Sequence, residues 1–292
     1  MRINTNVSSL TAQEASQNTG KTLTSSLEKL STGLRINKAS DDASGLAIAD
    51  KLRTQTTSIN QGIANGNSAV SLLQIADKSM SEQSNILDTI KAKLIQANTD
   101  TTSNDGKLSI AKDVNKLLDQ LNNIAKQTNY NGTTLLQAGR GSAHESKGLS
   151  FQVGEDRQDL IKTKTIQSNS TGLKLTSLKK GVSAAAATTA GAIKTNFGKT
   201  VVSAAQKLVD NAISKLNGYR GDIGSTQNQV ESAVRNLMTQ ATNVKAAESI
   251  IRDVDYAQES ANFNKQNIIS QAGSYAISQA NAVQQNVLRL LQ

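Results

Sequence analysis

The segment from Val202 to Ile251 decides the fold and reads VSAAQKLVDNAISKLNGYRGDIGSTQNQVESAVRNLMTQATNVKAAESII. Its apolar and small residues recur at steps that alternate between three and four over about seven heptads. The positions on this stripe are Val202, Ala205, Val209, Ala212, Leu216, Tyr219, Ile223, Thr226, Val230, Ala233, Leu237, Gln240, Val244, Ala247 and Ile251. Because so long an alternation is typical of a coiled-coil seam, the segment predicts one helix roughly 75 Å long.

Two earlier segments carry similar apolar stripes. The first consists of Ile110, Val114, Leu117, Leu121 and Ile124. The second has small or polar residues at some positions and otherwise reads Ile59, Ile63, Val70, Leu73, Met80, Leu87, Ile90 and Leu94. Three stripes in one chain most simply bury one another, so the expected fold class is mainly α, a long coiled-coil helical bundle.

Turn and loop signals separate the stripes. The cluster NTDTTSNDGK (Asn98–Lys107) predicts a turn, and residues 129–148 predict a longer loop. Residues 149–166 alternate loosely around a polar centre, which predicts a small β-hairpin. From Gln167 to Thr200 no clear period is present, which predicts a surface loop or a short helix.

Composition suits a thin bundle and argues against several classes of protein. Of 292 residues only 2% are aromatic, and the chain has no Trp, Pro or Cys, which excludes disulfides and removes the strongest helix breaker. The net charge of +9 does not predict nucleic-acid binding, because basic residues are spread along the chain and few rings could stack on bases. Neither a signal peptide nor a membrane span is expected, so composition alone would predict a cytoplasmic protein.

No group of residues predicts catalysis, a metal site or a cofactor. The single histidine, His144, lies in a glycine-flanked loop and has no Cys to complete a zinc site. Asp41 and Asp42 are interpreted as the first turn of a helix whose N-cap is Ser40. Three glycines at helical positions are expected to let a neighbouring backbone approach closely: Gly218, Gly221 and Gly224.

Both ends of the chain have narrow apolar stripes among Gln, Asn and Ser. The residues expected to form this packing are Leu23, Leu27, Leu30, Leu34, Ile269, Val283, Val287 and Leu290. An isolated helix this polar is marginal in water. We therefore expect both ends to be largely disordered in the free monomer. They should become ordered by burying these stripes against each other and against neighbouring subunits.

Four motifs together resemble those of bacterial flagellins. LSTGLRINKASDDASGLAIADKLRTQ (Leu30–Gln55) is similar to the N-terminal signature, and the final residues from Glu248 to Gln292 are similar to the C-terminal signature. QTNYNGTTLL (Gln127–Leu136) resembles the loop after the second long helix, and FQVG (Phe151–Gly154) resembles the start of the β-hairpin. The pattern is similar to flagellins of the Campylobacter–Helicobacter kind.

The resemblance implies a domain organisation. Residues 1–43 would pair with 252–292 as an inner-core coiled coil. Residues 44–172 and 195–251 would form an outer-wall bundle with its hairpin near 149–166. Residues 173–194 would be an exposed loop or short helix in place of outer domains.

The same resemblance implies a function and partners. The chain would be a secreted structural subunit, not an enzyme, that polymerises head-to-tail into the hollow flagellar filament. Implied partners are other copies of the chain, the filament cap and hook-junction proteins, and the type III export apparatus. A secretion chaperone would bind the C-terminal helix. No cofactor, nucleic acid or membrane is implied.

The break around Gly33–Gly45 falls where the inner helix would pass into the outer bundle. The residues expected at this joint are Arg35, Asp41, Asp42, Arg252, Asp253 and Asp255. Arg35 and Lys38 are expected to pair with Asp253 and Asp255, within a subunit or between subunits.

Two surface properties follow from comparison with the family pattern. Leu87, Asp88, Thr89, Ile90 and Ala92 occupy the place where flagellins sensed by the Toll-like flagellin receptor carry a basic and an acidic residue, so weak receptor activation is expected. Similar flagellins carry O-linked sugars on an outer segment. The alternative is a plain solvated loop that carries no sugars. The matching residues are Ser168, Ser170, Thr171, Ser183, Thr188 and Thr189.

Three alternatives compete with a filament subunit. A hook–filament junction protein shares the terminal helices but should match the two long signatures less well. The helical hairpin of a chemoreceptor would need a membrane span or a symmetric tip, and neither is visible. An inserted enzyme domain would need more residues than lie between the hairpin and the last long helices.

Overall fold

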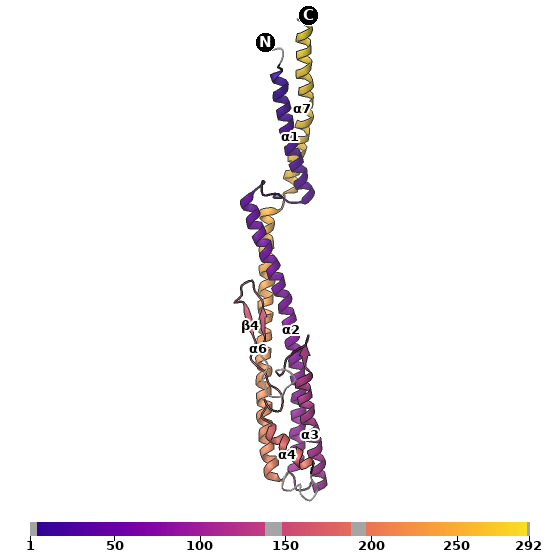
Figure 1. The fold of residues 1–292 in the computed structure, drawn as a ribbon, viewed down its shortest axis with the longest axis vertical. Coiled ribbons are helices and arrows are strands. Elements are labelled where there is room, and N and C mark those ends of the chain that lie inside the picture. Colours follow the sequence, from indigo (N-terminus) through magenta and orange to yellow (C-terminus); the bar gives the residue numbers. More distant parts are fainter. Residues whose placement is uncertain (1–4, 138–147, 188–196, 291–292) are drawn as a thin grey trace. The chain divides into compact units, whose positions relative to one another are not determined.

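The computed structural model describes residues 5–137, 148–187 and 197–290, and six long or short helices account for most of them (Figure 1). The mainly α class with a small β-hairpin is confirmed. The elements are α1 (Val7–Thr32), α2 (Ala43–Asn98), α3 (Asn104–Gln127), β1 (Asn129–Tyr130), β2 (Thr133–Thr134), β3 (Ser150–Gln152), β4 (Leu160–Lys162), α4 (Thr176–Ala186), α6 (Lys199–Arg252) and α7 (Tyr256–Leu290).

The chain forms two compact units. Met1–Thr57 together with Ala241–Gln292 make the first, which we call the terminal unit. Ser58–Gln240 make the second, which we call the central unit. Each is described by itself.

In the central unit α2 runs antiparallel to both α3 and α6. Ion pairs mark the α2–α6 register, because Lys91 contacts Asp210 at 2.6 Å and Asp77 contacts Arg220 at 2.9 Å. The seam predicted on α6 is confirmed at most positions up to Leu237, whereas Tyr219, Thr226 and Ala233 are only half-buried and Val234 is buried beside the last of them. Its fully buried members are Val202, Ala205, Val209, Ala212, Leu216, Ile223, Val230 and Leu237.

The buried face of α2 is a complete heptad stripe. The predicted Ile63 and Val70 are only half-buried, because Gly62 and Ala69 occupy the buried face instead, so the prediction is wrong by one residue at these two positions. The gaps that the sequence left are filled by small or polar residues that are also buried. The stripe is Ile59, Gly62, Gly66, Ala69, Leu73, Ala76, Met80, Gln83, Leu87, Ile90, Leu94 and Ala97. The alternation of three and four is therefore unbroken, and α2 is as regular as α6.

Glycines on α2 let the β3–β4 hairpin and α6 approach. A Cβ added at Gly62 would lie 2.4 Å from the carbonyl oxygen of Val153, and one at Gly66 would lie 2.4 Å from Val234 Cγ2. The Asn65 side chain donates to the carbonyl oxygen of Gln152 at 3.1 Å. The close approach expected at the glycines of α6 is wrong, because an added Cβ at Gly218, Gly221 or Gly224 would meet nothing within 4 Å.

Gln83 is the polar member of the α2 stripe. Its side chain is completely buried, and Nε2 donates to the carbonyl oxygens of Leu121 and Ser168, each at 3.1 Å. Its Oε1 has no partner among the described residues. These two directional bonds join α2 to α3 and to the chain after β4, and sliding α2 by one turn would break both. A buried polar group at a heptad position is a known way to fix register.

The stripe predicted on α3 is shifted by one residue at two positions. Leu118 and Ala125 are buried, whereas the predicted Leu117 and Ile124 are only half-buried. The shift occurs because α3 packs against α4 as well as α2, so its apolar face is wider than a two-helix seam. The Lys179–Asp119 ion pair, at 2.8 Å, joins α4 to α3.

The predicted hairpin is present, and a second one was missed. β3 and β4 pair antiparallel with Phe151 opposite Ile161. Inside the expected loop, β1 and β2 also pair antiparallel, with Tyr130 opposite Thr133. The chain after β4 is not a solvated loop, because α4 buries Leu178, Val182 and Ala185. In the described residues no outer domain lies between β4 and α6, as expected.

The two glycine environments give a matched stability test. Gly62→Ala should lower the unfolding free energy by about 1–3 kcal/mol, because its Cβ would overlap backbone that has little room to move. Gly221→Ala should raise the unfolding free energy by about 0.5–1 kcal/mol, because it is exposed within a helix and meets nothing. Thermal melts followed by circular dichroism measure both, and stabilisation by Gly62→Ala would contradict the docking of the hairpin on α2.

Candidate functional site

In the terminal unit α1 and α7 lie side by side and antiparallel (Figure 1). Near one end Asn6 Nδ2 donates to the carbonyl oxygen of Ala280 at 3.1 Å, and near the other Ser26 Oγ donates to Glu259. Asn6 is also the N-cap of α1, because its side chain accepts from the Ser9 N–H at 3.1 Å. Helices from the two ends of the sequence therefore form one pair.

The contact face of this pair is small and polar. Ser26 is the only described residue of α1 that is fully buried. On α7 the half-buried residues repeat at heptad spacing as Glu259, Phe263, Gln266, Ser270, Gly273, Ile277, Ala280 and Gln284. A seam so rich in Ser, Gln and Gly buries little apolar surface, so its hydrophobic stabilisation is small.

Many of the larger apolar side chains of both helices point away from this seam, although Phe263 and Ile277 of α7 are half-buried in it. Leu27 is 55% exposed, Ile268 66% and Tyr275 73%. Other exposed members are Val7, Leu10, Ile269 and Val283. These residues define what we call the terminal apolar surface. Exposed apolar side chains gathered in this way mark a surface that another molecule covers.

The residues predicted to pack the inner core are therefore divided. Leu23, Leu30 and Leu34 are half-buried within the terminal unit. Leu27, Ile269 and Val283 are exposed, so they are not covered within one chain, and their burial against neighbouring subunits stays a prediction. Small and polar residues fill most positions of the α1–α7 seam, which leaves these three side chains outside it. The side chains of Val287 and Leu290 lie outside the described residues.

Between α1 and α2 the chain makes a short strand-like contact with the segment between α6 and α7. Gly33 ends α1 in the left-handed conformation, with φ of 74° and its N–H bonded to the Lys29 carbonyl. Leu34 then pairs with Asp253 as an isolated antiparallel bridge. The Arg35 N–H donates to the Arg252 carbonyl at 2.7 Å, and the Val254 N–H donates to the Gly33 carbonyl at 3.0 Å. We call this contact the joint.

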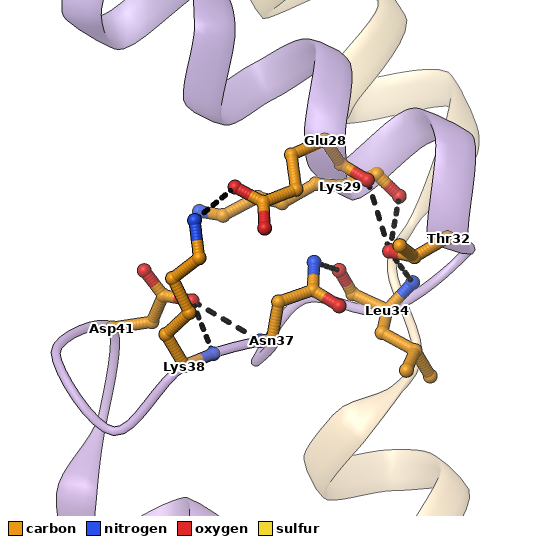
Figure 2. A network of polar contacts seen from close by, with 7 residues as sticks. All are labelled: Glu28, Lys29, Thr32, Leu34, Asn37, Lys38 and Asp41. Atoms are coloured by element: carbon orange, nitrogen blue, oxygen red, sulfur yellow. Dashed lines mark hydrogen bonds and ion pairs between the residues drawn. The ribbon is translucent and has the colours of Figure 1, made fainter.

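A polar network holds the loop that leads from the joint to the start of α2 (Figure 2). Asp41 Oδ2 accepts the backbone N–H groups of Asn37 and Lys38 at 3.1 and 3.0 Å. These hydrogen bonds lower the pKa of the Asp41 carboxyl, with smaller help from Lys29 and Lys38. The Lys38 ammonium contacts Glu28 at 2.7 Å, and this partner raises the pKa of the lysine. The Asn37 side chain donates to the Leu34 carbonyl at 3.2 Å.

The helix after the joint is capped two residues later than predicted. Asp42 Oδ1 accepts the Gly45 N–H at 2.8 Å, and α2 begins at Ala43. Asp42 is therefore the N-cap, and the assignment of this role to Ser40 is wrong. Asp41 lies in the preceding turn, where its carboxylate closes the loop instead of facing the helix dipole.

The ion pairs predicted across the joint do not form within the chain. The Arg35 guanidinium donates to the carbonyl oxygen of Ile251 at 2.6 Å instead of to a carboxylate. Asp253 accepts from the Ser249 hydroxyl at 2.6 Å. Asp255 accepts the N–H groups of Ala257 and Gln258 at 3.0 and 3.2 Å, where α7 begins. Both carboxylates are thus used at helix ends, which explains the difference.

One contributor at the joint, Tyr256, was missed from the sequence, whereas Arg252 was among the residues expected there. The Tyr256 hydroxyl donates to the Leu30 carbonyl at 2.5 Å and so links the start of α7 to the end of α1. Arg252 is mostly buried, and its nearest carboxylate oxygen, on Asp50, is 4.0 Å away. A tyrosine at the first turn of a polar C-terminal helix is a signal that could have indicated the first contact.

The remaining predicted surface residues are in the central unit. Asp88, Thr89 and Ala92 are exposed on α2, whereas Leu87 and Ile90 are completely buried. Ser168 and Ser170 are 0% and 8% exposed, so the expected exposure of these two is wrong. They are buried because this segment fills the space beside Gln83 and α3.

Other predicted residues are exposed or not described. Thr171 and Ser183 are exposed, and Thr188, Thr189 and His144 lie outside the described residues. Within the described ranges no cluster of three or more His, Cys, Asp or Glu side chains could hold a metal ion. No described helix combines the length and hydropathy that a bilayer span needs.

Removing the Asp41 carboxylate should loosen the loop at the joint. Because the pKa of Asp41 is lowered, its contribution is fully present above the ordinary pKa of aspartate and is lost as the pH falls through the lowered value. At neutral pH, Asp41→Ala should speed hydrogen exchange of the Asn37 and Lys38 amides by about tenfold. Hydrogen exchange should be measured on assembled protein, because the terminal helices are expected to be ordered there.

The exposed ion pair beside it provides the control. Lys38→Met removes the contact with Glu28 but leaves both bonds to Asp41, so exchange at these amides should change little. Equal effects of the two substitutions would contradict the role assigned to Asp41.

Comparisons with known proteins agree with this architecture. Residues 3–140 match the family model described as the bacterial flagellin N-terminal helical region, and residues 206–291 match the C-terminal helical region. The first match contains α1, one side of the joint, α2 and α3, and the second contains most of α6, the other side of the joint and α7.

Full-length relatives show the same similarity. The chain is 34% identical to flagellin of Bacillus subtilis (strain 168) over 306 residues, with 100% of both proteins covered. It is 31% identical to the flagellar filament 31.3 kDa core protein of Treponema maltophilum, again with 100% of both covered. Flagellin B of Helicobacter pylori (strain J99) is 27% identical, with 100% of this chain and 99% of that protein covered. The chain belongs to the bacterial flagellin family.

Proposed function

We propose that this chain is a structural subunit that polymerises head-to-tail into the hollow, extracellular filament of the bacterial flagellum. Flagellins are structural proteins and not enzymes. The observation that carries the proposal is the terminal apolar surface, which one chain leaves exposed on both α1 and α7. A second copy would cover it, and a head-to-tail contact that does not close on itself produces a helical polymer.

Folding of the terminal helices would be coupled to this addition. Their seam is polar and narrow, so a single pair gains little from burial. Binding energy from neighbouring subunits would then supply the ordering of the helices. Residues 1–43 with 252–292 would line the filament, and residues 44–172 with 195–251 would form its wall.

The same surface suggests the partners met before assembly. A secretion chaperone on the C-terminal helix would mask the apolar side chains of α7, including Ile268 and Val283. A largely unfolded terminal segment also suits passage through the type III export apparatus. The filament cap would contact the terminal helices at one end of the polymer, and the hook-junction proteins would contact them at the other end.

The first experiment compares the full chain with a chain that ends at Ile251. Both are added to short filament seeds and examined by electron microscopy. Filaments from the full chain alone are expected, since the truncated chain lacks α7. Growth of both chains would contradict the assignment of α7 to the inner tube, and growth of neither would favour a junction protein.

A point substitution separates assembly from folding. Ile269→Asp places a charge on the terminal apolar surface and should abolish seeded growth, while melting of the central unit is unchanged, because Ile269 is already exposed in the monomer. Asn281→Asp on the same helix adds the same charge at an exposed polar position and should slow growth far less.

Sharp, dispersed amide signals from both termini of the dilute monomer would contradict coupled ordering.

We also propose that this chain activates the Toll-like flagellin receptor weakly. The exposed positions Thr89 and Ala92 lack the basic and acidic side chains that sensed flagellins carry. Thr89→Arg combined with Ala92→Glu should raise the signal in a receptor reporter assay, with either single substitution as control. Strong signalling by the natural chain would overturn this proposal.

O-linked glycosylation is proposed only for part of the predicted set. Thr171 and Ser183 have the exposure that a transferase needs, whereas Ser168 and Ser170 do not. Intact-mass measurement and peptide mapping of protein from its natural source should find sugars on Thr171 or Ser183 and none on Ser168 or Ser170. Modification of Ser168 in folded protein would contradict the burial argument.

A further inference from the structure

The chain contains the dipeptide Asn–Gly three times, in three different settings. Asn65–Gly66 lies within α2, Asn217–Gly218 lies within α6, and Asn131–Gly132 lies between β1 and β2. Asn–Gly is chemically the least protected of dipeptides, because glycine has no side chain to shield its backbone nitrogen from the neighbouring carboxamide. The three copies therefore allow the backbone setting to be separated from the sequence.

Only the third copy, Asn131–Gly132, lies outside a helix and has an asparagine side chain that no hydrogen bond with a described residue holds in place. Asn131 and Gly132 have φ of 48° and 81°, so they are the two central residues of a tight hairpin turn with positive φ at both. Both residues are exposed, and the Asn131 side chain makes no hydrogen bond with a described residue. A Cβ added at Gly132 would meet nothing within 4 Å, and the Gly132 N–H makes no hydrogen bond with a described residue, so solvent and base reach it.

In the two helical copies, hydrogen bonds hold either the asparagine side chain or the glycine N–H in place. The carboxamide of Asn65 is fixed at both ends, since it donates to the Gln152 carbonyl at 3.1 Å and accepts from the Gln61 side chain at 3.0 Å. Asn217 is also exposed, but its glycine lies inside the 54-residue α6, where the N–H is a helical donor. Reaction at either site must wait for a helix turn to open.

We propose that Asn131 is a site of spontaneous covalent modification, selected over Asn65 and Asn217 by the β1–β2 turn. Base removes the proton from the Gly132 nitrogen, which attacks the side-chain carbonyl carbon of Asn131. A carbon–nitrogen bond forms as the bond to the side-chain nitrogen breaks, and ammonia leaves. Water then opens the cyclic imide at either carbonyl, which gives aspartate or isoaspartate at position 131.

The product would affect the neighbouring packing. Isoaspartate adds one methylene group to the main chain of a turn that is closed by only two residue pairs. The chain after this turn is buried, with Leu135 and Leu136 at 3% and 0% exposure. The Leu135 N–H and the Leu136 carbonyl are both engaged in backbone hydrogen bonds, so the turn is tied to the core of the central unit.

The test is ageing of the full-length monomer in mildly alkaline buffer at physiological temperature. Peptide mapping by mass spectrometry follows a one-dalton gain at each asparagine, and methyltransferase labelling reports isoaspartate. Conversion at Asn131 should be at least about tenfold faster than at Asn65 or Asn217, because helical sites must open first. The same chain in denaturant should convert all three at similar rates.

Two variants complete the test. Asn131→Gly keeps a residue suited to positive φ and should remove most isoaspartate labelling, whereas Asn217→Ser should leave it unchanged. Equal conversion at Asn131 and Asn217 in the folded chain would show that exposure alone decides, and would overturn the proposal. Absence of conversion at Asn131, with conversion in denaturant, would overturn it as well.

Discussion

The property on which the structure depends is the mismatch between the two faces of the terminal helices. Inside the α1–α7 pair the side chains are mostly Ser, Gln, Gly and Ala, whereas Leu27, Ile268 and Tyr275 point outward. With mostly small residues inside and many large ones outside, the pair leaves most of its hydrophobic driving force unused within one chain. In the proposed filament, the narrow seam would join α1 to α7 and the outer face would provide the free energy of association.

The joint shows how such a weak pair is held in place. It does not use ion pairs across the two chain segments. Instead, backbone groups of Gly33, Arg35 and Val254 bond to carbonyls, and carboxylates are used to cap helices or close the loop. Backbone hydrogen bonds are directional and depend little on salt, whereas exposed ion pairs contribute little and are screened. The geometry at the joint is therefore set mainly by main-chain bonding, and side chains such as Asp41 and Tyr256 secure it.

Most of the fold could be predicted from the sequence, and the errors have identifiable causes. The α6 stripe was correct at most positions because a long helix between constant neighbours keeps one heptad phase. On α3 the phase was wrong at Leu117 and Ile124 because a second neighbour, α4, widens the buried face. The exposure of Ser168 could not be judged, because its burial depends on Gln83, distant in sequence. At the terminal helices, periodicity identified the apolar residues, but a single stripe does not say whether its partner is the same chain or another.

The two units consequently differ in what stabilises them. The central unit has long heptad seams, close packing at Gly62 and Gly66, and a buried Gln83 that fixes register, so its core is complete in one chain. The terminal unit has a cap at Asn6, a joint and a polar seam, and the residues of its terminal apolar surface have no cover in one chain. Local stability should follow this division, since opening free energies track the apolar surface that each segment buries. In the proposed filament, such a subunit would keep its wall folded on its own, and its ends would become ordered when a neighbour is present.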